Sequence, residues 1–207
     1  TDFVTNADFK AEKIIIEELK KARPNYSIIS EENGTEKNKD NKNVWIIDPI
    51  DGTLNFLHGI PHFAISIALK SNNEIVSGLI FDPIKDEMFY AEKNKGAFFN
   101  NHRIRVSKKN NINDCLFVTG RKSKKEFDFQ YRRSGSAALD MAYVAAGRYD
   151  GFFQHELKIW DIAAGIIIIK EAGGIINDID LTLTKDIDVI TSSPDIHQKM
   201  MEKIDNF

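Results

Sequence analysis

Apolar positions along this chain follow two periodicities, which together predict alternating helices and strands. Apolar residues at helical spacing predict helices over residues 8–23, 136–146, 160–172 and 194–204. Short apolar runs, or apolar residues that alternate with polar ones, predict strands over residues 27–30, 44–47, 63–69, 75–81, 87–91, 97–99, 175–179 and 189–191. Residues 35–43 are nearly all Glu, Lys, Asn and Asp, so we predict a solvated loop there.

The order of these elements predicts one mixed domain. The strands between residues 63 and 99 follow one another through polar turns, which predicts an antiparallel meander. Helices and strands then alternate, so the predicted fold class is α+β with stacked layers. No stretch has the composition of a linker, and we predict a single domain over residues 1–207. We expect Phe98, Phe99, Phe152 and Phe153 in core strands or at a subunit contact.

The composition narrows the class of protein. Hydrophobic residues make up 42% of the chain and charged residues 29%, as in ordinary globular proteins. Thirty-one acidic residues against 28 basic ones give a net charge of −3, whereas a DNA-binding domain usually carries a clear basic excess. The single cysteine, Cys115, permits no intrachain disulfide, and we expect a small buried side chain in a reducing compartment. No apolar run approaches the ~20 residues of a membrane span, and we expect a cytoplasmic protein.

The segment at residues 48–52, with the sequence DPIDG, carries the strongest chemical signal. A predicted buried strand ends there in two carboxylates, Pro49 stiffens the chain between them, and Gly52 permits a tight turn into a short helix at Thr53. The carboxylates and the carbonyl of Ile50 would then point at one spot, and such hard oxygen ligands suit Mg²⁺. The N–H groups at the start of the helix could hold a phosphate oxygen. The alternative interpretation is a solvated turn with an Asp helix cap.

Further carboxylates favour the metal interpretation. Glu31 and Glu32 end a predicted apolar strand, and Asp161 opens the predicted helix over residues 160–172, which is apolar nearly all round. Acids are common at helix starts because they complement the helix dipole. A carboxylate at the mouth of a buried helix nevertheless needs a partner. Three acidic sites at element ends, in a chain of modest net charge, favour one shared cation.

Several segments resemble the signatures of one enzyme family. Residues 45–56 (WIIDPIDGTLNF) closely resemble the first signature of the inositol monophosphatase family, and residues 159–165 (IWDIAAG), followed by EAGG, resemble the second. The motifs VTNAD at 4–8, SEE at 30–32 and GSAA at 135–138 are similar to its other motifs, in the family's order. This resemblance implies the layered α-β-α-β-α sandwich of the inositol monophosphatase and fructose-1,6-bisphosphatase type, in a homodimer.

The same resemblance implies a lithium-sensitive, Mg²⁺-dependent phosphatase in which an activated water attacks phosphorus without a covalent phosphoenzyme. One Mg²⁺ would be held by Glu31, Asp48 and the carbonyl of Ile50, a second by Asp48, Asp51 and Asp161, and a third, weaker one near Glu31. The catalytic residues would be Asp8, Thr53, Glu31 and Asp51, with Thr53 paired to Asp8 to orient or deprotonate the water. The substrate contacts would be Asp51, Gly52, Thr53, Ser136, Ala137, Gln154 and Asp161, and Glu32 would support the metal ligands from behind.

Two departures from the family pattern bear on the substrate and on the length of the chain. Members that act on inositol usually carry Glu where this chain has Gln154. We expect myo-inositol 1-phosphate as substrate, with 3′-phosphoadenosine 5′-phosphate, fructose 1,6-bisphosphate and histidinol phosphate as alternatives. The stretch near residues 120–134 is shorter than in the family, and the sequence begins at Thr1 rather than Met. We therefore expect residues to be missing at both places.

Two other patterns suggest different chemistry. His58 and His62 lie four residues apart, as in some zinc sites, but Pro61 opposes a regular helix, so we interpret them as turn and surface residues. The basic residues at 121–125 (RKSKK), with Arg132 and Arg133, favour a solvated face. Such a run can also bind RNA, which leaves a regulatory partnership with RNA or the transcription machinery as an alternative function.

Overall fold

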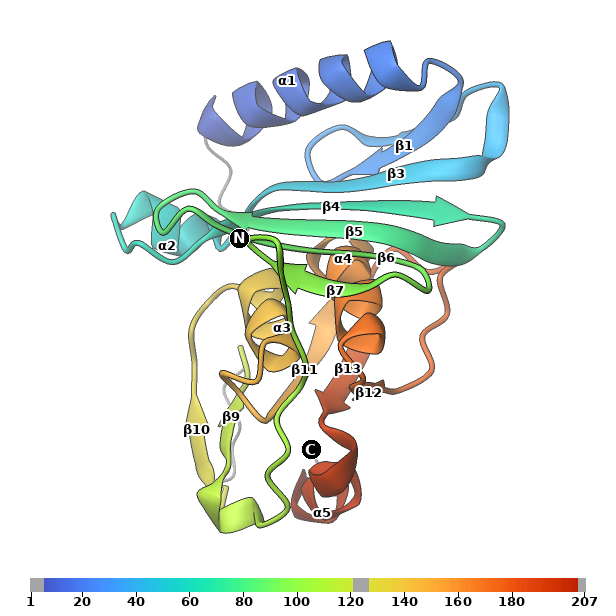
Figure 1. Ribbon diagram of the computed structural model, residues 1–207. Helices are drawn as coiled ribbons and strands as arrows, with labels where there is room; N and C mark the ends of the chain where they lie inside the picture. The colour runs from blue at the N-terminus through green and yellow to red at the C-terminus, as the bar shows by residue number, and fades with distance from the viewer. Residues whose placement is uncertain (1–5, 121–126, 205–207) are drawn as a thin grey trace.

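The chain folds into five stacked layers, α-β-α-β-α, as Figure 1 shows. The structure is a computed structural model and describes residues 6–120 and 127–204. The helices in these ranges are α1 (Asn6–Ala22), α2 (Thr53–Leu57), α3 (Ala137–Ala145), α4 (Ile159–Glu171) and α5 (Pro194–Ile204), with a 3₁₀ turn at Ile112–Asp114. The strands in these ranges are β1 (Tyr26–Ser30), β2 (Gly34–Glu36), β3 (Asp40–Asp51), β4 (Ala64–Ser71), β5 (Glu74–Asp82), β6 (Glu87–Glu92), β7 (Gly96–Phe99), β8 (His102–Arg103), β9 (Leu116–Val118), β10 (Gln130–Arg132), β11 (Gly151–Leu157), β12 (Ile175–Ile176) and β13 (Ile187–Ser192). The layered α+β fold predicted from the sequence is confirmed.

The larger sheet has the strand order β2-β1-β3-β4-β5-β6-β7-β8. β1 runs parallel to β3, and each neighbouring pair from β3 to β8 is antiparallel, which confirms the predicted meander. Figure 1 shows α1, in blue, over one face of this sheet and α3 and α4 against the other. The sheet is therefore covered on both faces, and its strand β3 lies between α1 and α4.

The loop predicted over residues 35–43 is wrong in part. Residues Gly34–Glu36 form β2, and β3 begins at Asp40 rather than at Val44. β2 pairs with β1 at the edge of the sheet. Asp40, at the start of β3, pairs with Tyr26 of β1, and β3 pairs with the end of β4 from Asn43 onward. Backbone hydrogen bonds at a sheet edge need no apolar side chains, so a polar composition does not exclude pairing.

The smaller sheet, in the order β10-β9-β11-β13-β12, lies on the other side of α3 and α4. Periodicity does not predict β9 and β10, because strands of three residues are too short to show an alternation. Phe152 and Phe153 are fully buried in β11, which confirms them as core strand residues, and Cys115 is buried as expected. The basic residues at 121–125 lie outside the described residues, as does part of the shortened stretch near 120–134.

Close packing of α4 holds the middle layer between the sheets. Its residues from Ile162 to Ile169 are all buried, as the apolar pattern predicts. On one side Gly78 of β5 meets α4 so closely that an added Cβ would lie 2.7 Å from Ile167 and 2.8 Å from Ala164. On the other side Gly165 faces Met141 of α3, where an added Cβ would lie 2.7 Å from the sulfur. Within the described ranges, no helix combines the length and the apolar character needed to cross a membrane.

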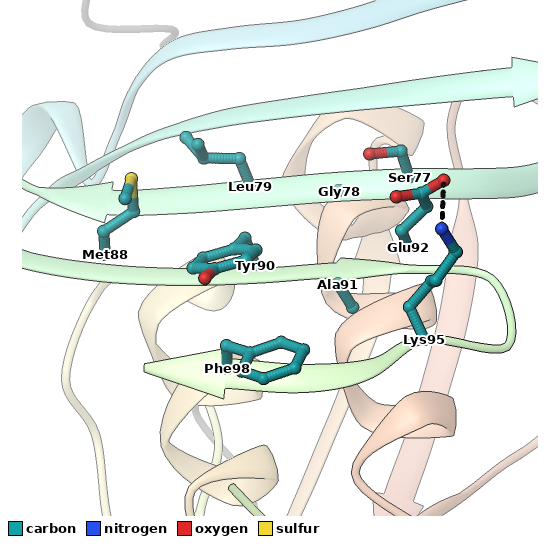
Figure 2. Close-up of a pocket in the computed structure, with 9 residues that line it drawn as sticks. All are labelled: Ser77, Gly78, Leu79, Met88, Tyr90, Ala91, Glu92, Lys95 and Phe98. Carbon is teal, nitrogen blue, oxygen red and sulfur yellow. Dashed lines mark ion pairs between the residues drawn. The ribbon is translucent and has the colours of Figure 1, made fainter. Parts of the chain in front are cut away.

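The face of the larger sheet that is turned away from α4 carries a shallow apolar groove. Figure 2 shows Leu79 of β5, Tyr90 of β6 and Phe98 of β7 side by side across three adjacent strands. The groove has a volume of about 340 Å³, and the ion pair between Glu92 and Lys95 lies at one end of it. Ser77 also lines this face, so alternate residues of β5 contact either the groove or α4.

The contact between Gly78 and α4 predicts a sharp dependence on side-chain volume. Gly78→Ala should lower the free energy of unfolding by ~1–3 kcal/mol, because the added methyl group meets backbone atoms of Ala164 that cannot turn aside. Ser77→Ala, one residue away on the opposite face, should change it by less than ~0.5 kcal/mol. Urea unfolding of the three proteins measures both values, and equal stabilities would contradict this account of the packing.

Candidate active site

A β-bulge in β3 brings two carboxylates to one face of the sheet. Asp48 pairs with Ser66 of β4, and Asp51 pairs with Ala64. From the first pair to the second, β3 therefore advances by three residues and β4 by only two. Side chains three apart on a regular strand point to opposite faces, and the extra residue restores the same face. The N–H of Ile50 donates to Asp48 Oδ1 at 3.0 Å, which fixes the first carboxylate inside the bulge. Asp48 and Asp51 are 2% and 8% exposed.

The start of α3 holds the carboxylate of Asp51. Ser136 caps α3, and its hydroxyl donates to Asp51 Oδ2, as does the N–H of Ala138 at 2.8 Å. Burial raises the pKa of Asp51 to about 6, although the donors from Ser136, Ala138 and Ala137 act in the opposite direction. The positive end of the helix dipole favours a negative charge at this place. Ser136 and Ala137, predicted as substrate contacts, are nearly fully buried and contribute to the site through Asp51.

The start of α4 supplies the third carboxylate. Asp161 lies in its first turn, where Oδ2 accepts a hydrogen bond of 2.8 Å from the N–H of Lys158. The hydroxyl of Ser66 donates to the carbonyl of Trp160 at 3.2 Å and so ties the start of α4 to the strand position opposite Asp48. Burial and the charge of Asp51 raise the pKa of Asp161 well above its usual value.

The three carboxylates converge on one point. Asp48, Asp51 and Asp161 each offer an oxygen, and these oxygens lie within 4.8 Å of one another. Burial, together with repulsion from Asp51 and Glu31, raises the pKa of Asp48 well above its usual value. Buried carboxylates that repel one another lack a neutralising charge, and an all-oxygen donor set suits a hard divalent cation. The residues present therefore fit the magnesium that the sequence predicts.

Glu31 stands beside this cluster at the end of β1. Its side chain is half-buried and hydrogen-bonds to Asp48. Burial raises the pKa of Glu31 to about 7, with added repulsion from Glu32, Asp51 and Asp8. Glu32 is half-buried in the same turn. Asp8 is fully buried on α1, and its charge acts on Glu31, so α1 also faces the site.

The short helix α2 follows the bulge directly. Gly52 precedes it with φ 92°, and a Cβ there would lie 3.1 Å from the carbonyl of Gly135 and 3.2 Å from that of His62, so only glycine fits. The hydroxyl of Thr53 donates to the carbonyl of Ile50 at 3.0 Å. That carbonyl keeps a second lone pair. The structure thus brings Gly52, Thr53 and Ile50 together beside Asp48 and Asp51.

Gln154 lies against the backbone of Gly120. An added Cβ on Gly120 would lie only 2.1 Å from Gln154 Oε1, so a larger residue there would displace the end of this side chain. Gln154 is half-buried in β11. Its predicted contact with substrate remains a prediction.

Three supporting residues escaped the sequence analysis. Asn55 donates to the carbonyls of His62 and Ser134 at 2.8 and 2.9 Å and so links α2 to the turn before α3. In that turn the hydroxyl of Ser134 donates to Asp140 at 2.6 Å, and burial raises the pKa of Asp140 well above its usual value. The sequence offers one signal for this pair: Asp140 lies inside a helix of closely packed alanines, and a buried carboxyl group needs a hydrogen-bond donor.

The raised pKa values of the carboxyl groups predict how Mg²⁺ changes stability with pH. Glu31 and Asp51 keep their protons up to about pH 7 and about pH 6 when folded, but only to about pH 4 when unfolded. The folded state therefore binds more protons across this window, and these groups lower the free energy of unfolding as the pH rises through it. Mg²⁺ replaces those protons, so its stabilising effect should grow with pH.

Thermal unfolding at about pH 5 and about pH 8, with EDTA or with Mg²⁺, measures this effect. The gain in midpoint on adding Mg²⁺ should be several degrees larger at the higher pH. Glu31→Gln should reduce that difference, whereas Glu36→Gln, at an exposed position on β2, should not. A gain that is independent of pH in the wild-type chain would contradict the placement of these groups in one metal site.

Comparisons with known proteins agree with this geometry. The sequence profile of the inositol monophosphatase family matches residues 1–206. An inositol-1-monophosphatase of Rhizobium meliloti is 48% identical over 188 residues, covering 84% of this chain and 71% of that protein. A Haemophilus influenzae protein named Nus factor SuhB is 40% identical over 220 residues, covering 98% of this chain and 82% of that protein.

Solved structures show the same fold. The extragenic suppressor protein suhB from Bartonella henselae superimposes with a TM-score of 0.90 at 44% identity, over 98% of this chain and 84% of that one. The inositol monophosphatase from Anabaena sp. PCC 7120 gives 0.88 at 33% identity, over 98% and 87%. The full-length profile match, the identities and the shared fold agree on one assignment: this chain belongs to the inositol monophosphatase family and is a phosphoric monoester hydrolase.

Proposed function

We propose that this enzyme hydrolyses myo-inositol 1-phosphate to inositol and phosphate in a Mg²⁺-dependent reaction. The observation that carries the proposal is the convergence of Asp48, Asp51 and Asp161 within 4.8 Å beside Glu31, with the first two carboxylates buried and the third half-buried. The relative from Rhizobium meliloti, named inositol-1-monophosphatase, supports the choice of substrate.

The chain's own residues divide the work at this site. Glu31, Asp48, Asp51, Asp161 and the carbonyl of Ile50 would hold the magnesium ions. When bound, Mg²⁺ supplies positive charge that acidifies a water molecule and neutralises phosphate oxygens. The tethers from Ile50, Ser136, Ala138 and Lys158 keep the carboxylates in place before the ions arrive. That preorganisation lowers the cost of assembling the site for each turnover.

We expect Thr53 to orient the attacking water. Because its hydroxyl hydrogen is committed to the carbonyl of Ile50, its oxygen lone pairs are left to accept a hydrogen bond from the water. This hydrogen bond would direct a lone pair of the water toward phosphorus. A proton of the water would pass to a carboxylate, for which Asp8 on α1 is our candidate. The first N–H groups of a helix have no acceptor within that helix. Those of Gly52 and Thr53 would therefore bind a phosphate oxygen.

The alcohol portion of the substrate would lie between the start of α3 and the middle of β11. Asp51 and Gln154 face it from opposite sides in this proposal, with Ser136 and Ala137 behind Asp51. Gln154 can donate and accept hydrogen bonds without a charge. It therefore suits a polyol hydroxyl, and it also tolerates the alternative phosphate esters better than a carboxylate would.

Phosphate release from myo-inositol 1-phosphate tests the proposal. Turnover should require Mg²⁺ and should fall in the presence of Li⁺ at millimolar concentration. The ratio of kcat/KM for this substrate to that for 3′-phosphoadenosine 5′-phosphate, fructose 1,6-bisphosphate and histidinol phosphate decides the substrate. A higher kcat/KM for one of these three would leave the reaction class in place and replace the substrate.

Asp51→Asn should reduce kcat/KM by more than ~100-fold, because changes to groups that merely orient metal ligands already cost 10–100-fold. The metal-free variant should remain folded, since an amide in place of the carboxylate removes charge repulsion from the cluster. Asp178→Asn removes one acidic charge at an exposed position and should leave turnover unchanged. Circular dichroism checks the fold, and near-wild-type turnover by Asp51→Asn would contradict the proposed site.

A second candidate function is a regulatory role with RNA or the transcription machinery. Its support is the name Nus factor SuhB, carried by relatives such as the one from Haemophilus influenzae. Arg132 and Arg133, which follow the basic residues at 121–125 along the chain, are exposed and would be the contact.

If this role holds, RNA binding should weaken steeply as salt increases, because phosphate contacts release counterions. Arg132→Gln with Arg133→Gln should weaken binding and flatten the salt dependence. Lys93→Gln with Lys95→Gln removes the same charge from an exposed turn and serves as the control. Filter binding at several salt concentrations measures this, and absent or salt-insensitive binding would exclude the role.

A further inference from the structure

Glu12 is a buried carboxylate that the amphipathic pattern of α1 places among solvated acids. Its side chain is 0% exposed, whereas Glu17 and Glu18 on the same helix are exposed. Among the ion pairs of the described residues, none involves Glu12. Burying a carboxylate without a cation is costly, and an apolar side chain would fill the same space at lower cost. The position therefore needs a carboxylate for its hydrogen bonds.

Within the part of the chain that the structure describes, the hydrogen bonds to Glu12 come from residues 30–33, at the end of β1 and in the turn that follows it. Oε1 accepts from the hydroxyl of Ser30 at 2.8 Å, from the N–H of Asn33 at 3.1 Å and from the side-chain amide of Asn33 at 2.5 Å. Oε2 accepts from the N–H of Glu32 at 3.0 Å. One carboxylate thus holds this turn by four donors, two of them backbone N–H groups. Hydrogen bonds to an ionised acceptor are about twice as strong as neutral ones.

Glu31 lies in the middle of this turn. Its own N–H donates to the carbonyl of Ile47 in β3 at 3.2 Å. The residues on either side of it, Ser30 and Glu32, are bound to Glu12. The backbone of Glu31 is consequently fixed from the sheet and from α1, and its side chain is directed to Asp48. Without Glu12, α1 would no longer hold the backbone on either side of Glu31, which would be left with its pairing within the sheet.

We propose that Glu12 is a positioning residue of the hydrolytic site, which fixes the turn of residues 30–33 and thereby sets the position of Glu31 for the cation. This inference rests on the proposed function, because it takes Glu31 as a metal ligand. It makes the docking of α1 on the larger sheet a condition of tight cation binding. A single helix then provides both Asp8, next to the site, and the anchor of a metal ligand one helical turn later.

Glu12→Gln is the sharpest test, because it changes one contact. The amide keeps an oxygen for the three donors at the Oε1 position and sets an NH₂ group against the N–H of Glu32. The loss therefore falls on the backbone next to Glu31. Glu17→Gln removes the same charge from the exposed face of the same helix and is the matched control.

The first readout is Mg²⁺ binding to the metal-free proteins, measured by calorimetry and by the rise of the unfolding midpoint with Mg²⁺ concentration. Glu12→Gln should weaken binding by roughly 10- to 100-fold, and Glu17→Gln should not. The second readout is turnover, where Glu12→Gln should need more Mg²⁺ for half-maximal activity but approach the wild-type kcat at saturation. A merely structural role would lower the midpoint equally with and without Mg²⁺ and leave the affinity unchanged, which would overturn the proposal.

Asn33→Ala covers the case in which Glu12→Gln does not fold. Asn33 is exposed, so its loss leaves the core intact while it removes the side-chain amide donor to Glu12. It should weaken Mg²⁺ binding in the same direction but less, and an unchanged affinity would contradict the proposal.

Measurements on the wild-type chain distinguish failure of the proposed function from failure of the role of Glu12. If the wild-type chain gains no stability from Mg²⁺ and shows no turnover, the proposed function fails and this inference with it. If the wild-type chain binds and both variants match it, only the role of Glu12 is overturned.

Discussion

The mutual repulsion of Asp48, Asp51 and Asp161 is the constraint on which the arrangement of this protein depends. Their oxygens lie within 4.8 Å of one another, in surroundings that screen charge far less than water does. Each carboxylate is held by its own donors: the N–H of Ile50 for Asp48, the start of α3 for Asp51, and the N–H of Lys158 for Asp161. These donors hold the carboxylates without neutralising them, and a gap lined with negative charge is what a divalent cation needs.

The layered fold is what brings these separate donors to one place. β3 ends at the site in a bulge, while α3 and α4 both begin there, so two helix dipoles point their positive ends at the same carboxylates. The distance between Asp51 and Asp161 then depends on how α3 packs against α4. That packing is tight, since Gly165 leaves no space for a side chain opposite Met141. The geometry of the metal site is thus set by contacts in the hydrophobic core.

Sequence spacing predicted which acids converge but not how they do so. DPID indicates two carboxylates at one spot, yet side chains three apart on a regular strand would diverge, and only pairing with β4 reveals the bulge that turns them together. Glu12 could not be distinguished from Glu17 by periodicity, because its partners lie 18 to 21 residues away. For the same reason, the polar composition of residues 35–43 predicts a loop where the structure has parts of β2 and β3. Local patterns report burial of side chains, whereas these features depend on backbone partners supplied by distant segments.

The apolar packing of α4 opposes the charge repulsion at its first turn. A helix that carries the carboxylate of Asp161 there could relieve repulsion by sliding away from the other acids. The helix stays in place only if breaking its contacts costs more free energy than the relief of the repulsion would gain. Burial of the residues from Ile162 to Ile169 supplies such contacts, at about 25 cal/mol for each Å² of apolar surface removed from water. Gly78 and Gly165 bring α4 into direct contact with β5 and α3, where a shift would open cavities. The apolar segment of α4 therefore stands directly behind the carboxylate of Asp161, and its packing keeps that carboxylate in place.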